Sequence, residues 1–178
     1  IPYHTLDEVE KLHFQPEKAD GNLIIEGDNL LALKALLPQY AGKVKCIYID
    51  PPYNTGNEGW VYNDNVSSPM LKDWLGKEVG KDDLTRHDKW LCMMVPRLRL
   101  LRELLAEKGV IFISCDDNEL SSLLSLMNEL LGEGNRVGVI IWRNVTDNNP
   151  TNIAIEHEYV VCYAKQKDHI DAVWKSKV

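Results

Sequence analysis

The residues best suited to chemistry in this chain are Asp50, Pro51, Pro52 and Tyr53, which are consecutive. They directly follow the run Val44–Ile49, whose apolar and β-branched side chains predict a short buried strand. Because proline cannot donate to a strand ladder, the strand is expected to stop at Asp50. The prolines fix two φ angles, and open α/β sheets bind ligands beyond the carboxyl ends of their strands. We therefore expect a rigid turn that holds a planar polar group.

This turn suits the methylation of an aromatic amine, such as the exocyclic amino group of adenine. The amine is a poor nucleophile because its lone pair is delocalised into the ring. Two acceptors, the Asp50 side chain and the Pro51 carbonyl, would draw the nitrogen toward tetrahedral geometry and direct its lone pair at a sulfonium methyl group. The carboxylate would stabilise the positive charge that develops on the nitrogen. Tyr53 offers a face on which an extruded base can stack, at about 1–3 kcal/mol.

The elements that must position this turn alternate along the chain. Asp28 or Asn29 is expected to cap a helix that runs to Leu37 and is stopped by Pro38. Strands are predicted at 22–26, 44–49, 110–114, 137–142 and 159–164, and further helices at 88–107, closed by Gly109, and 118–131. The first strand, helix and strand predict a parallel βαβ unit. The whole pattern predicts an α/β fold with a mostly parallel, Rossmann-like sheet, helices on both faces, and an antiparallel last pair of strands.

Two segments fall outside this alternation. Residues 1–21 are polar, carry two prolines and predict an irregular N-terminal arm before the domain that spans 22–178. Residues 54–87 form a long polar loop, and such loops in compact domains are usually functional or disordered. Its aromatic residues Trp60 and Tyr62 either contact a bound base or pack the loop onto the domain.

Other polar residues indicate less. The five histidines lack paired spacing on any one element, so we expect no metal site. His157 is the exception as a candidate site residue because it lies between two glutamates just before the last strand. Asp116 and Asp117 follow the strand 110–114, and we expect them to cap the next helix, with lining of a cleft as the alternative.

Composition restricts the class of protein. A net charge of −7 argues against strong binding of duplex nucleic acid by this chain alone, because such binding needs clustered cations. The four cysteines are widely spaced without metal-ligand spacing, which predicts free thiols in a cytoplasmic protein. Apolar runs are far shorter than the roughly 20 residues that span a bilayer, so no membrane association is expected.

Several segments taken in order resemble a known family. They are Asn22–Leu33, which contains Gly-Asp-Asn; the Asp-Pro-Pro-Tyr turn with Asn54-Thr55-Gly56; Val61–Asn65; Gly109–Ser114 with Asp116–Asn118; and Glu156–Tyr159. Together they resemble the β-class amino-methylating DNA methyltransferases (the N6-adenine/N4-cytosine family). The chain is most similar to the modification (Mod) subunits of type III restriction–modification systems, over nearly everything after residue 22.

The resemblance implies S-adenosyl-L-methionine as methyl donor and the N6 amino group of adenine in DNA as target. It also implies a Mod homodimer and a restriction subunit as partners. Catalysis would fall to Asp50, Pro51, Pro52 and Tyr53; the cofactor would lie at Asp28, Asn29 and Asp50; and the target base would contact Tyr53, Asn54, Trp60, Tyr62 and His157.

The sequence also departs from the family. No glycine-rich Phe-x-Gly-x-Gly segment follows a strand, and in the β class this cofactor motif comes late, after a target-recognition region. We therefore expect residues 22–178 to be the amino-proximal part of an incomplete catalytic domain that alone binds cofactor weakly and methylates nothing. The alternatives are a methyltransferase for cytosine N4, an RNA base or an amide, and an inactive remnant that serves as a DNA- or subunit-docking module.

Overall fold

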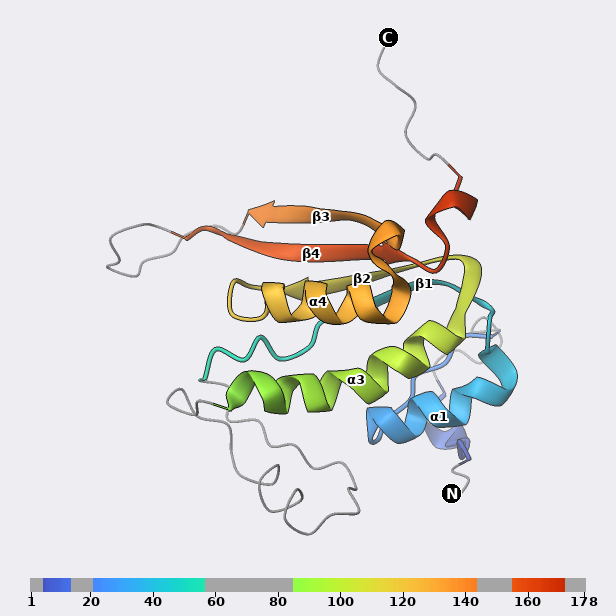
Figure 1. Cartoon of the computed structure of the whole chain (residues 1–178). Helices are drawn as coiled ribbons and strands as arrows, with labels where there is room; N and C mark the ends of the chain where they lie inside the picture. The colour runs from blue at the N-terminus through green and yellow to red at the C-terminus, as the bar shows by residue number, and fades with distance from the viewer. Residues whose placement is uncertain (1–4, 14–20, 57–84, 144–154, 172–178) are drawn as a thin grey trace.

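A computed structural model describes residues 5–13, 21–56, 85–143 and 155–171 of the chain. Within these residues four strands form one sheet in the order β1-β2-β4-β3, with α1, α3 and α4 on one side of it (Figure 1). The strands are β1 (Val44–Ile49), β2 (Leu105–Cys115), β3 (Arg136–Arg143) and β4 (His157–Ala164). The helices are α1 (Asn29–Tyr40), α3 (Arg86–Leu104) and α4 (Leu120–Leu131), with short 3-10 turns η1 (Glu10–Leu12), η2 (Glu133–Asn135) and η3 (Lys167–His169).

The predicted α/β fold class is confirmed, but the described sheet is mixed. The pair β1 and β2 is parallel, and α3 is the crossover helix between them. The strand β4 is antiparallel to both β2 and β3, so the predicted antiparallel last pair is confirmed. The strands β2 and β3 run in the same direction, but β4 lies between them and runs in the opposite direction. Two of the three strand pairs are therefore antiparallel, and the described sheet is not mostly parallel.

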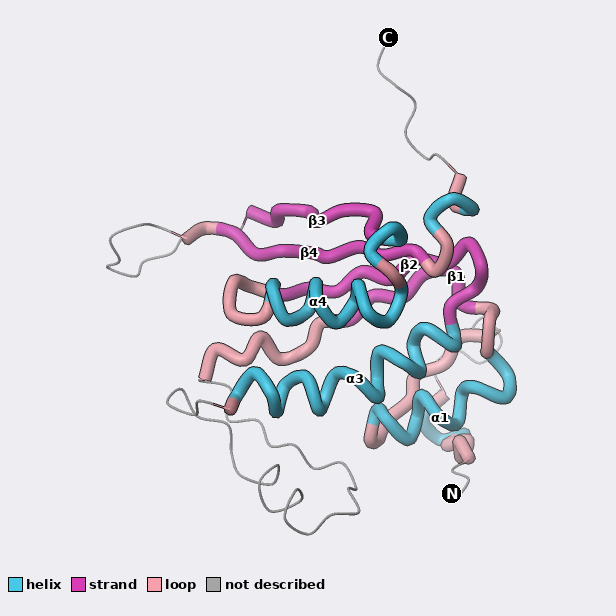
Figure 2. The backbone as a smooth tube through the Cα atoms, viewed as in Figure 1, coloured by secondary structure: helices cyan, strands magenta, loops and turns pink. Residues whose placement is uncertain are grey.

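The helices lie along one face of the sheet (Figure 2), and the buried side chains of the core lie between the two layers. Ile47, Ile111 and Ile113 line that face and pack against buried side chains of α3 and α4, including Trp90. On the other face Tyr48, Ile140 and Trp142 are 62%, 49% and 61% exposed. The predicted helices on both faces are therefore seen on one face within the described residues. None of the described helices is long and apolar enough to cross a membrane.

The prediction of a first strand at 22–26 is wrong. These residues pair with no strand, and Leu23 and Ile24 are 59% and 102% exposed. The apolar run satisfies the pattern of a strand, but a strand also needs a hydrogen-bonding neighbour, and β1 pairs only with β2 among the described residues. The βαβ unit is therefore β1–α3–β2 instead of the predicted one. The helix α1 continues past Pro38 to Tyr40, where Ala41 N–H donates to the Leu37 carbonyl.

The end of α3 also differs from the prediction. Helix and strand meet at Leu104 and Leu105, and Gly109 lies inside β2 instead of closing a helix. A Cβ added at Gly109 would lie 2.8 Å from the carbonyl oxygens of Ala106 and Val44. The register of β1 on β2 shifts at this point, so the two backbones approach too closely for any side chain.

Candidate active site

The predicted catalytic turn lies at the carboxyl edge of β1, as expected. Register brings three strand ends together there, because Ile49 pairs with Ile113 on β2 and Cys115 pairs with Tyr159 on β4. Asp50 is exposed, and the two prolines and Tyr53 are half-buried. The turn thus presents its carboxylate to solvent while its backbone rests on the sheet edge.

Tyr53 is held from β4. Its hydroxyl donates to Glu158 Oε2 at 3.2 Å. Next to it, the Tyr48 and Ser114 hydroxyls are hydrogen-bonded at 2.8 Å on the open face of the sheet. Burial raises the pKa of Tyr53 well above its ordinary value, and the charges of Asp50 and Glu158 raise it further. Tyr53 therefore stays a neutral phenol that can donate a hydrogen bond and offer its ring face.

The backbone of the turn is held from α3. The indole N–H of Trp90 donates to the Pro52 carbonyl at 2.7 Å, and Trp90 has no exposed surface. Because proline lacks an N–H, the turn cannot be fixed by its own ladder of hydrogen bonds. The hydrogen bond from the buried Trp90 of α3 fixes the turn instead.

Asn54 is turned into the protein. It has a φ of 62°, a left-handed conformation that asparagine tolerates better than most residues, and its side chain is fully buried. Its amide donates to Glu119 Oε1, which also bonds His87 Nδ1 at 2.7 Å. In this arrangement the Asn54 side chain anchors the end of the turn to Glu119 in the protein interior. Its predicted contact with the target base stays a prediction.

The predicted cofactor residues Asp28 and Asn29 lie at the start of α1. Asp28 Oδ1 accepts from the N–H groups of Leu30 and Leu31 at 2.9 and 3.1 Å, so the predicted cap is confirmed. Asn29 Oδ1 accepts from Arg97 Nε at 2.7 Å, which ties this helix start to α3. These bonds leave Asp28 exposed, and its role toward the cofactor stays a prediction.

His157 and the aspartates form a second set of contacts at this edge. His157 Nε2 and the Tyr159 hydroxyl lie 2.8 Å apart, and that hydroxyl donates to Asp117 Oδ1 at 2.8 Å. Asp116 accepts from the Asn118 N–H, so it forms a local turn, and α4 begins without a side-chain cap. The prediction that these aspartates cap α4 is therefore wrong, since Asp117 is bonded across to β4. Trp60 and Tyr62 lie outside the described residues.

Four supporting residues were missed by sequence reasoning. They are His87, Trp90, Glu119 and Glu158, each joined to the turn or its support by the hydrogen bonds above. Only Glu158 had a signal, because it lies in the segment Glu156–Tyr159 that carries part of the resemblance. The contact partners are 38, 65 and 105 residues apart, so no local pattern marks them.

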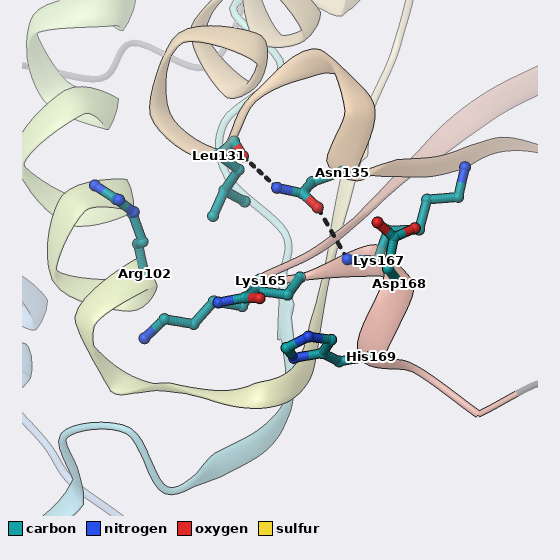
Figure 3. A pocket seen from close by; sticks show the side chains of 8 residues that line it. Arg102, Leu131, Asn135, Lys165, Lys167, Asp168 and His169 are labelled. Carbon is teal, nitrogen blue, oxygen red and sulfur yellow. Dashed lines mark hydrogen bonds between the residues drawn. The ribbon is translucent and has the colours of Figure 1, made fainter.

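Two buried cysteines and a separate cavity contribute no reactive group to this edge of the sheet. Burial raises the pKa of Cys115 to about 12 and that of Cys162 to about 11, so both remain thiols. No group of metal-binding side chains occurs in the described part of the chain. A cavity of about 320 Å³, lined mainly by polar and basic side chains such as Arg102, Lys165 and His169, lies at the carboxyl end of β4 (Figure 3). Because β4 is antiparallel to β2, which is parallel to β1, this cavity is at the edge opposite Asp50.

Known proteins match both the sequence and the fold. The family described as DNA methylase matches residues 44–177. The Mod subunits of the type III restriction–modification enzymes EcoP15I of Escherichia coli and EcoPI of Escherichia phage P1 are 45% and 43% identical over 100% and 94% of this chain. The chain spans only 30% and 28% of their lengths. Two solved structures have a TM-score of 0.50: a putative DNA modification methylase of Thermus thermophilus complexed with S-adenosyl-L-methionine, and the PvuII DNA methyltransferase (cytosine-N4-specific). They are 16% and 11% identical, cover 82% and 80% of this chain and are themselves covered over 54% and 49%, so they support the fold alone.

Proposed function

Because the chain belongs to the DNA methylase family, we propose that it carries the methyl-transfer turn of an S-adenosyl-L-methionine-dependent DNA methyltransferase. The observation that supports this most is the fixed arrangement of Asp50–Tyr53 at the carboxyl edge of β1. The Asp50 carboxylate is exposed, the Tyr53 hydroxyl donates to Glu158, and the Pro52 carbonyl accepts from Trp90. A target amine and a methyl donor can both reach such an edge.

Each residue of the turn has a role that its chemistry suits. Asp50 and the Pro51 carbonyl accept hydrogen bonds from the two hydrogens of the target amino group. Asp50 stabilises the charge that develops on nitrogen, and the methylated amine then loses one proton to water. The Tyr53 ring stacks on the extruded base, and the hydrogen bond to Glu158 limits its rotation. The proposed transfer to the amine is direct and uses no covalent enzyme intermediate.

Two exposed carboxylates suit a cationic cofactor. When bound, S-adenosyl-L-methionine supplies an electrophilic methyl group on a sulfonium centre. Asp50 is exposed beside the open face of the sheet, and Asp28 is exposed at the start of α1. Their carboxylates could accept hydrogen bonds from the cofactor and favour its positive charge. Asn29 would contribute through the same helix start.

We infer the N6 amino group of adenine as the target, on the resemblance to type III Mod subunits. Cytosine N4 is the second candidate, because the same turn chemistry serves both amines and a cytosine-N4-specific enzyme shares the fold. The chain spans about 30% of the length of the Mod subunit of EcoP15I. We further propose that the full-length protein binds DNA, forms a Mod homodimer and associates with a restriction subunit. Residues 22–178 would then be the amino-proximal part of its catalytic domain. A cytoplasmic location accords with the four free cysteines.

The experiment measures transfer of labelled methyl groups from S-adenosyl-L-methionine to duplex DNA by the full-length protein that contains this chain. Asp50→Ala and Tyr53→Ala should abolish transfer while circular dichroism stays unchanged. Asp168→Ala is the matched control, because Asp168 lies at the opposite edge. Nucleoside analysis of the product separates N6-methyladenine from N4-methylcytosine. Full activity of Asp50→Ala would refute the proposal, and unlabelled DNA with wild-type protein would favour the docking-module alternative.

A further inference from the structure

A buried polar cluster lies directly beneath the catalytic turn. Its centre is Glu119, which has no exposed surface and stands at the start of α4. Glu119 Oε1 accepts from the Asn54 side chain, and it lies 2.7 Å from His87 Nδ1 at the start of α3. Both donors reach the same oxygen, and Glu119 Oε2 is buried without a hydrogen-bond partner among the described residues, so burial of this carboxylate is costly. Core packing alone does not explain a buried glutamate at this position, and the contacts of Glu119 indicate a role for it.

The neighbouring contacts define the direction of these hydrogen bonds. Arg86 Nε donates to His87 Nε2 at 3.3 Å, so that ring nitrogen is an acceptor. The proton of a neutral His87 then lies on Nδ1 and is donated to Glu119. The Asn54 amide is oriented by the same logic, because its oxygen would repel the carboxylate. Arg86, His87, Glu119 and Asn54 thus form one chain of donors and acceptors that ends at the catalytic turn.

The cluster fixes the turn at a point where its backbone is unusual. Asn54 follows Tyr53 directly and adopts a left-handed conformation. Without the bond to Glu119, the next residue after the catalytic tyrosine would be free to leave that conformation. Trp90 bonds the Pro52 carbonyl, so two separate bonds, one on each side of Tyr53, fix the backbone that carries its ring, and the bond to Glu158 limits the rotation of the ring.

We propose that Glu119, supported by His87, is a positioning residue for methyl transfer, which it serves by holding Asn54 and with it the Asp50–Tyr53 turn. The inference rests on the proposed function. The carboxylate touches no reacting atom in this arrangement, so it acts through the turn. A small displacement of a catalytic group can lower a rate by up to about 100-fold.

The test uses matched variants of the full-length protein. Glu119→Ala should lower kcat by about 10- to 100-fold while KM for S-adenosyl-L-methionine stays within about twofold. Glu119→Gln should stay close to wild type, since its amide oxygen can still accept from Asn54 and His87. Asn54→Asp should be impaired, because two carboxylates then face each other.

A second readout does not depend on activity. Hydrogen exchange of the Trp90 indole proton, followed by NMR in this chain, should accelerate in Glu119→Ala, while core amides of β2 keep their rates. Glu129→Ala, an exposed change in the same helix, is the control. The inference is overturned if Glu119→Ala folds with unchanged kcat and unchanged indole exchange, or if Asn54→Asp folds with the kcat of wild type. If Glu119→Ala does not fold, the test rests on the other two variants: Asn54→Asp should lower kcat, and Glu119→Gln should keep it close to wild type. A further outcome is that wild type transfers no methyl group while Glu119→Ala still accelerates exchange of the Trp90 indole proton. That pair of results would contradict the proposed function and still show that Glu119 holds the turn.

Discussion

The Trp90→Phe variant should reveal how much of the site's order comes from the core. Trp90 is fully buried in α3 and donates to the Pro52 carbonyl at 2.7 Å. Phenylalanine keeps most of the ring but cannot donate a hydrogen bond. The change therefore removes a hydrogen bond to the Asp50–Tyr53 turn from a fully buried position.

The magnitude follows from two contributions. An acceptor left without its partner costs about 1–3 kcal/mol. The smaller ring of phenylalanine leaves space in the core, and a partial loss of side-chain volume of this kind costs about 1 kcal/mol. We expect a total of about 2–4 kcal/mol, which is a large share of the roughly 5–15 kcal/mol that stabilises a domain.

Equilibrium urea unfolding of this chain, followed by circular dichroism, measures the change. Tyr163→Phe is the matched control: it removes a buried hydroxyl that donates to Asn128 Oδ1 at 2.6 Å, far from the turn. It should cost about 1 kcal/mol and leave the NMR shifts of Tyr53 unchanged. Trp90→Phe should move those shifts. If Trp90→Phe unfolds within about 0.5 kcal/mol of wild type, the bond does not hold the turn and our reasoning fails.

Three further predictions concern the cap, the thiols and the catalytic ring. Asp28→Ala removes the α1 cap and should cost about 1 kcal/mol in urea unfolding, so an unchanged midpoint would contradict the cap. Burial raises the pKa of Cys162 from 9.0 to about 11, so the folded chain keeps a proton that the unfolded chain releases. The free energy of unfolding should therefore fall between about pH 9 and pH 11, and less steeply in Cys162→Ala, whereas equal slopes would refute this cause. Glu158→Gln removes a charge that raises the pKa of Tyr53, so that pKa should fall in an ultraviolet titration; a constant pKa would show that the charge does not reach the ring.

Sequence patterns located the elements of the site more accurately than their connections. The run Val44–Ile49 was predicted as a strand and is β1, because its apolar residues and the two prolines after it are local signals. The same kind of pattern failed at residues 22–26, where no described neighbour pairs with the chain. Periodicity reports what a segment could bury, and a strand also requires a partner that only the whole fold supplies.

The position of the Asp50–Tyr53 turn at the end of β1 was predictable, and the residues that hold it were not. Asp50–Tyr53 is contiguous, so residue type and order were sufficient. The partners of the turn, Trp90, Glu119 and Glu158, come from three elements and are brought to it by α3 and by the registers of β1 on β2 and β2 on β4. Those registers depend on contacts across the sheet, which no single segment encodes.

The two sides of the sheet contribute differently to the turn. From the open face, Glu158 accepts a hydrogen bond from the Tyr53 hydroxyl, and the carboxylate of Asp50 is exposed. From the helix side, Trp90 and Glu119 bond the backbone and the residue after the ring, and both are fully buried. Hydrogen bonds are stronger in such a low-dielectric interior. The exposed groups can therefore stay preorganised for a developing positive charge without being buried themselves. It follows that substitutions on the helix side should change the rate of transfer more than the binding of substrates.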